Sequence, residues 1–156
     1  MIMNKEIAIL KDINTFLDDY IGMFGTDYNR KQLRRLERGF TKFSSDLQGY
    51  KIPAKLDEAE YVSQEHKESI SNYFNILYKY IDAIIDDIKT LRAGFSHFSQ
   101  GTDKYIEDMK LIQSNNNSTI STCKDISIGY KQITDGLRKN PNLIHLVKQE
   151  LNNQKS

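Results

Sequence analysis

The sequence predicts an all-α fold, an elongated antiparallel helical bundle or coiled coil built around one long central helix. Apolar residues recur in alternating steps of four and three from Ile70 to Ile112, interrupted only at Thr102. A 3.5-residue period held over about six heptads is typical of a long helix that packs lengthwise against other helices. The alternation of apolar and polar residues that marks a half-buried strand does not recur along the chain, so we expect helices throughout.

The apolar seam of this long helix is widest over residues 70–91. Its flanks there carry Tyr73, Tyr78, Tyr80 and Ile85. An apolar face this broad requires two or three neighbouring helices, as in a bundle. Each tyrosine combines an apolar ring with a hydroxyl, which suits the margin of an interface. We predict that the three tyrosines form an aromatic margin that contacts a partner; the edge of the protein's own core is the alternative.

The chain before the long helix predicts two amphipathic helices. The first ends near Gly22 and Gly25, because glycine favours the end of a helix. The second begins after Thr26 or Asp27, whose side chains can accept a hydrogen bond from an unpaired amide at the helix start. We predict a single helical domain over residues 1–156 with helices at about 4–23, 28–48, 54–113, 120–139 and 141–153.

The end of the long helix depends on which of two segments breaks it. The helix begins after Pro53, since proline suits the first helical turn. Residues 114–119 all favour caps and turns, and they predict a hairpin although the heptad phase continues beyond them. A break at Gly94–Gly101 is the alternative, because glycine weakens a helix. Asn140 followed by Pro141 then predicts the start of a short last helix.

The composition points to one soluble domain. With 156 residues, of which 38% are hydrophobic, the chain can bury one core. Lys plus Arg (22) nearly balances Asp plus Glu (21), so the overall charge does not favour nucleic acid or an anionic membrane as a partner. A single cysteine, Cys123, excludes an internal disulfide framework and fits a reducing compartment. The start lacks a secretory signal and no stretch approaches the ~20 apolar residues of a membrane span, so we expect a cytoplasmic protein.

The second predicted helix concentrates basic residues on one face. These residues are Arg30, Lys31, Arg34, Arg35, Arg38 and Lys42. The face lies opposite the apolar stripe of the same helix and could bind phosphates or acidic headgroups. We interpret it first as a solvated surface whose charges pair with acids such as Glu37. Peripheral binding to an anionic membrane, by a banana-shaped coiled-coil module, is one alternative function.

The segment from Arg92 to His97 places an arginine and a histidine five residues apart. It resembles the R-x4–6-H signature of HEPN-domain ribonucleases, which are all-α bundles. The resemblance implies metal-independent RNA cleavage at a dimer interface, with His97 as the acid or base and Arg92 stabilising phosphate charge. A histidine titrates near neutral pH and a guanidinium stays charged, which suits these roles. A ribonuclease is therefore a second alternative function.

Other patterns of catalytic or metal-binding residues are missing from the sequence. His66, His97 and His145 have no partner at ligand spacing, so we predict no metal and no cofactor. There is also no glycine-rich phosphate loop. We predict a non-enzymatic helical module that works by protein–protein association. It would act through self-assembly as a homodimer, or by binding another protein as an adaptor, chaperone, inhibitor or immunity-type protein.

Overall fold

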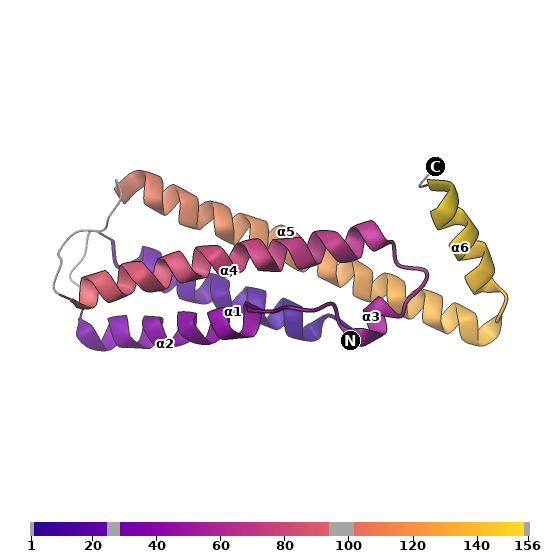
Figure 1. The fold of residues 1–156 in the computed structure, drawn as a ribbon, viewed down its shortest axis with the longest axis horizontal. Helices are drawn as coiled ribbons and strands as arrows, with labels where there is room; N and C mark the ends of the chain where they lie inside the picture. Colours follow the sequence, from indigo (N-terminus) through magenta and orange to yellow (C-terminus); the bar gives the residue numbers. More distant parts are fainter. Residues whose placement is uncertain (1, 25–28, 94–101, 155–156) are drawn as a thin grey trace.

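The structure is a computed structural model that describes residues 2–24, 29–93 and 102–154. Over these residues it confirms the all-α class, because every regular element is a helix. The helices are α1 (Asn4–Ile21), α2 (Arg30–Leu47), α3 (Ala54–Asp57), α4 (Gln64–Arg92), α5 (Thr102–Lys139) and α6 (Leu143–Gln154). Figure 1 shows α1, α2, α4 and α5 lying lengthwise in an elongated bundle, with α6 standing off one end.

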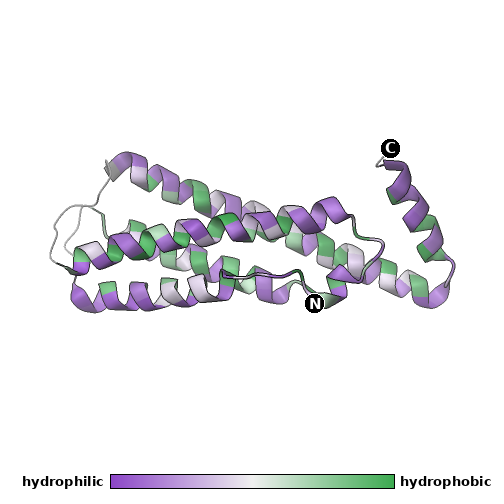
Figure 2. Ribbon diagram, in the orientation of Figure 1, coloured by the Kyte–Doolittle hydropathy of each residue, from purple (hydrophilic) through white to green (hydrophobic). Residues whose placement is uncertain are grey.

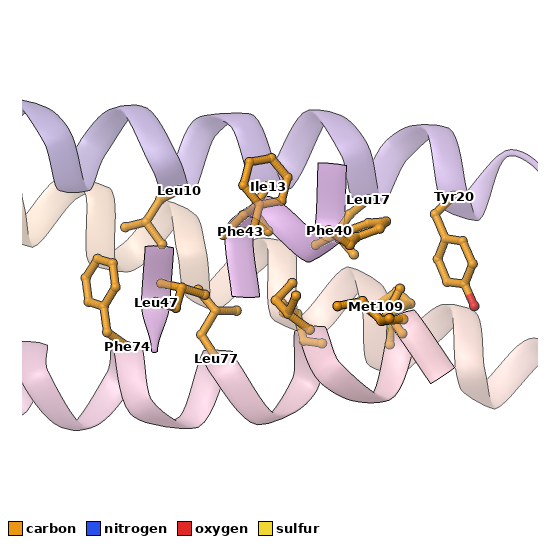
Figure 3. Packing of buried hydrophobic residues seen from close by; sticks show 14 of the residues in the cluster. Leu10, Ile13, Leu17, Tyr20, Phe40, Phe43, Leu47, Phe74, Leu77 and Met109 are labelled. Carbon is orange, nitrogen blue, oxygen red and sulfur yellow. The ribbon is translucent and has the colours of Figure 1, made fainter. Parts of the chain in front are cut away.

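The four long helices run in alternating directions along the bundle (Figure 1). α2 packs chiefly against α4, α1 packs chiefly against α5, and α1 also contacts α2. A single cluster of buried apolar side chains draws residues from α1 through α5. Figure 3 shows part of this cluster, where Leu10, Ile13 and Leu17 of α1 point toward the side of α4 that carries Phe74 and Leu77.

α1 and α2 approach closely at an aromatic cluster. The ring of Phe16 packs edge-on against Phe40 and Phe43, with ring centroids 5.9 and 5.2 Å away. The Phe16 ring occupies the space that any larger side chain at position 39 would need. A Cβ atom added to Gly39 would be only 2.1 Å from Cε1 of Phe16. The glycine therefore makes room for the ring between the two helices.

The first two helices follow the sequence prediction closely. α1 ends at Ile21, directly before Gly22. α2 is capped by Asn29, whose Oδ1 accepts a hydrogen bond from the amide of Gln32 at 2.7 Å. The predicted caps Thr26 and Asp27 lie outside the described residues, and the prediction that one of them caps this helix is wrong, because Asn29 does so. The amphipathic period places both helices within about two residues.

The prediction of one long central helix over 54–113 is wrong. The segment contains the short helix α3, the helix α4 and the beginning of α5. Ser63 has an extended backbone, and its hydroxyl accepts a hydrogen bond from the amide of His66 at 3.1 Å, which caps α4 and separates it from α3. α4 ends at Arg92 and α5 begins at Thr102, so the alternative break point, Gly94–Gly101, falls in the part of the chain that is not described.

The predicted hairpin at 114–119 is also wrong, because α5 continues without a break through this segment. The polar side chains find tertiary partners in the helical state. Asn116 is fully buried, accepts a hydrogen bond from the hydroxyl of Tyr73 in α4, and donates one to Oδ1 of Asn14 in α1 at 2.8 Å. Nδ2 of Asn14 donates in turn to Oδ1 of Asn117 at 2.9 Å. This amide layer replaces the local hydrogen bonds that would otherwise favour a turn.

A second set of hydrogen bonds joins α1, α4 and α5 near the C-terminal end of α1. The hydroxyl oxygens of Tyr20 and Tyr105 lie 3.2 Å apart, and the hydroxyl of Tyr105 donates to a carboxylate oxygen of Asp87. Together with the amide layer, it fixes the relative positions of α1, α4 and α5 at two levels of the bundle.

Candidate interaction surfaces

The basic residues of α2 form a ridge along the outer side of the bundle. All six side chains of this basic ridge, Arg30, Lys31, Arg34, Arg35, Arg38 and Lys42, are exposed. The apolar residues of α2 all lie on the opposite, buried face. Figure 2 shows mostly hydrophilic colour along the outward side of this helix. The structure thus places the cations on one free surface, as the sequence predicts.

Most of the ridge has no acidic partner among the described residues. Only Arg35 forms an ion pair, at 2.7 Å from Oδ2 of Asp19, and its guanidinium lies over the ring of Phe16. Glu37, the acid that the sequence offered as a partner for the ridge, instead pairs with Arg92 of α4. The ridge therefore keeps most of its positive charge exposed.

A second candidate surface lies in the C-terminal part of the chain, and the sequence patterns above did not predict it. α5 extends past the start of α1, and no residue from Gly129 to Gln154 is buried. We call residues 129–154 the C-terminal arm. Its apolar residues are Tyr130, Ile133, Leu137, Leu143, Ile144, Leu146, Val147 and Leu151. Several of these continue the heptad phase of the buried part of α5, but here the side chains are half-buried or, at Leu146, exposed.

The arm touches the rest of the bundle at only a few points. The hydroxyl of Tyr61 lies 3.3 Å from Oγ1 of Thr134, and its ring lies 5.9 Å from that of Tyr130. Lys148 of α6 pairs with Glu60 at 2.9 Å. A groove of about 700 Å³ remains between the start of α4, the second half of α5 and α6. Its apolar lining includes Ile126, Tyr130, Ile133 and Leu151.

The three tyrosines of the predicted aromatic margin do not share one face. Tyr73 is half-buried and bonds to Asn116 of α5. Tyr78 faces the other side of α4, where Asp82 also accepts a hydrogen bond from Ser44 of α2 at 2.6 Å. The hydrogen bond to Asp82 raises the pKa of Tyr78. Tyr80 is 48% exposed, so among the three it is the one most available to a partner.

The arginine and histidine of the ribonuclease-like segment are only half described. Arg92 is the last residue of α4, where its guanidinium donates to Oε2 of Glu37. His97 lies outside the described residues. Its distance from Arg92, on which the ribonuclease interpretation depends, is therefore not defined here.

Several titratable groups are buried where α1 meets α2 and α5. Glu6 is only 5% exposed, and burial raises its pKa above the ordinary value of 4.5. Burial, together with the nearby carboxylate of Glu6, raises the pKa of the Cys123 thiol to about 12. The hydroxyl groups of Tyr50 and Ser127 are buried without a hydrogen-bond partner among the described residues. A cavity of about 670 Å³ lies against Glu6, Tyr50 and Phe74.

Glu6 gives a pH-dependent prediction. Because its pKa is raised on folding, ionisation is less favourable in the folded than in the unfolded chain, and this costs stability as the pH rises above about 4.5. We expect Glu6→Gln to raise the urea midpoint at pH 7, with the gain shrinking as the pH falls through the raised pKa of Glu6 toward 4.5 and disappearing below that value. Glu65→Gln, at an exposed position of α4, is the control and should show no comparable gain. A Glu6→Gln protein less stable than wild type at pH 7 would contradict this assignment.

The described residues contain no group of three or more His, Cys, Asp or Glu side chains that could hold a metal ion. Among the same residues, no helix is both long and apolar enough to span a membrane. The chain matches no known protein family, no curated protein and no solved structure. The exposed surfaces of the protein are therefore the basis for its proposed function.

Proposed function

We propose that the protein is a non-catalytic helical module that works by association with a protein partner, and that the C-terminal arm is the surface it uses. The observation that carries the proposal is the burial pattern of α5 and α6. Eight apolar side chains lie on residues 129–154; seven of them are half-buried, Leu146 is exposed, and none is fully buried. Where α1 covers the same helix α5, apolar side chains on the inner face are buried, as at Cys123.

Helices in proteins owe most of their stability to the packing of an apolar face against a neighbour. Burying one large apolar side chain contributes about 1.5–3 kcal/mol, so a partner that covered several of these residues would gain a substantial free energy of binding. The occupant that fits a groove between helices is an amphipathic helix that inserts apolar residues at positions i, i+3, i+4 and i+7. The groove beside α6 offers apolar side chains for such a helix, among them Ile133 and Leu151, together with polar ones such as Glu65 and Asp125.

The partner is either a second copy of this chain or a different protein, and a mass measurement separates the two. Light scattering on a size-exclusion column would give twice the mass of 18.1 kDa for self-association. We expect a homodimer, if it forms, to become monomeric when the arm is made polar by Val147→Asp. A monomeric wild-type protein would leave association with a different protein as the form of the proposal to test.

The variant Leu146→Asp tests the arm directly. Leu146 is 59% exposed on α6, so the substitution leaves the core intact while placing a charge on the arm. We expect it to abolish the dimer, or capture of the protein partner from the native cells, without changing the thermal midpoint. Leu111→Asp is a matched control, because Leu111 is also 59% exposed but lies on α5 within the bundle. Equal loss of binding in both variants, or in neither, would overturn the assignment to the arm.

A further inference from the structure

The basic ridge of α2 supports an inference that is independent of the arm. We propose that this ridge binds the phosphate backbone of a double-stranded nucleic acid without reading its sequence. The contact would be electrostatic, since arginine and lysine neutralise phosphates and release the counterions condensed around the duplex.

Positive charge is concentrated on α2. α2 carries six basic and two acidic residues, a net charge of +4, whereas the whole chain has a net charge of only +1. The remainder of the chain is therefore acidic, at −3. A near-neutral protein that gathers its positive charge on one helix presents a local field that its overall charge does not reveal.

The cations of the basic ridge are accessible to a ligand. All six are exposed, and among the described residues only Arg35 has an ion-pair partner. Arg30, Arg34, Arg38 and Lys42 follow one another at four-residue intervals, which sets them in a row about 18 Å long at 1.5 Å per residue. A duplex presents one charge per 1.7 Å of its axis, so a row of this length can meet several phosphates.

The shape and chemistry of the ridge favour a duplex over a membrane or a single strand. The ridge is one helix wide, and on the α1 side it is bordered by the carboxylate of Asp19, which pairs with Arg35. A flat anionic membrane would meet that carboxylate as well as the cations. Every apolar side chain of α2 is buried, so the ridge offers neither the anchors of a membrane-bound helix nor the aromatic rings on which single strands stack.

Fluorescence anisotropy with a labelled duplex of mixed sequence tests the proposal. Wild-type protein should bind at 50 mM salt, and the logarithm of its affinity should fall against the logarithm of salt concentration with a slope of about −4, as for four or five neutralised phosphates. The triple variant Arg30→Gln, Arg34→Gln, Arg38→Gln should bind at least about tenfold more weakly and with a slope nearer −1. Its thermal midpoint should match the wild type, because these side chains are exposed and unpaired in the described structure.

The matched control removes three positive charges from α5, with Lys104→Gln, Lys110→Gln and Lys124→Gln, all at exposed positions. It should keep an affinity within about threefold of the wild type. Equal weakening by both triple variants would mean that only net charge matters and would overturn the proposal. So would the absence of duplex binding at 50 mM salt, or binding to phosphatidylserine vesicles in preference to the duplex. Leu146→Asp should bind the duplex as the wild type does, so the two proposals can fail separately.

Discussion

Replacement of Ile84 by aspartate is expected to unfold the protein. Ile84 lies in the second half of α4 and is completely buried within the apolar cluster. An unpaired carboxylate at such a position costs several kcal/mol, against a total stability of about 5–15 kcal/mol for a domain of ordinary size. Urea denaturation followed by circular dichroism should show either no folded baseline or a midpoint displaced far below that of the wild type.

The control for this change is Ile76→Asp, two turns earlier on the same helix. Ile76 is 50% exposed, so the introduced charge stays in water and the urea midpoint should move little. A protein with Ile84→Asp that unfolds at the wild-type midpoint would show that α4 does not bury this face.

The second large effect is expected at the amide layer, from Asn116→Ala. This change removes the acceptor for the Tyr73 hydroxyl and the donor to Asn14, and leaves both groups in a partly buried site without this partner. Orphaned buried groups cost about 1–3 kcal/mol, and the lost packing adds to this, so we expect destabilisation by about 2–3 kcal/mol in urea denaturation.

The neighbouring residue provides a matched control. Asn115 is exposed on the same turn of α5, and alanine is a better helix former than asparagine by a few tenths of a kcal/mol. Asn115→Ala should therefore leave stability unchanged or raise it slightly. If both substitutions had the same effect, residues 114–119 would contribute only their helix propensity and the amide layer would be energetically unimportant.

Local signals in the sequence were sufficient for the features that depend on one helix at a time. The apolar stripe and the glycine after Ile21 locate α1, and the period of α2 places its basic residues opposite its buried ones. Such features follow from 3.6-residue geometry and from caps that act within one turn. The sequence does not reveal which acids a cation meets, and Glu37 pairs across the bundle with Arg92 instead of with the ridge.

The two main errors have a tertiary cause. The hairpin predicted at 114–119 does not form because Asn116 and Asn117 bond to Asn14, about 100 residues earlier in the chain. The arm was missed for a related reason. The heptad phase runs on through Tyr130 and Leu137, and sequence alone cannot show that α5 extends past the start of α1, which therefore does not cover them. Tertiary contacts therefore override local turn or helix propensity. Asn14 supplies hydrogen-bond partners to residues of the 114–119 segment, whereas within the described part of the chain no neighbouring helix fully buries the apolar residues of the arm.

The pairing of α1 with α5 has a consequence for the order in which the chain folds. During synthesis, α2 and α4 become available to each other early, since Ser44 and Asp82 are separated by 38 residues. α1 emerges first but bonds to residues such as Asn117, which follow Asn14 by 103 positions. Contacts between such distant segments form late and slow the folding of small domains. The part of the apolar face of α1 that packs on α5 must therefore wait for the last long helix, and in that interval the nascent chain is most exposed to aggregation.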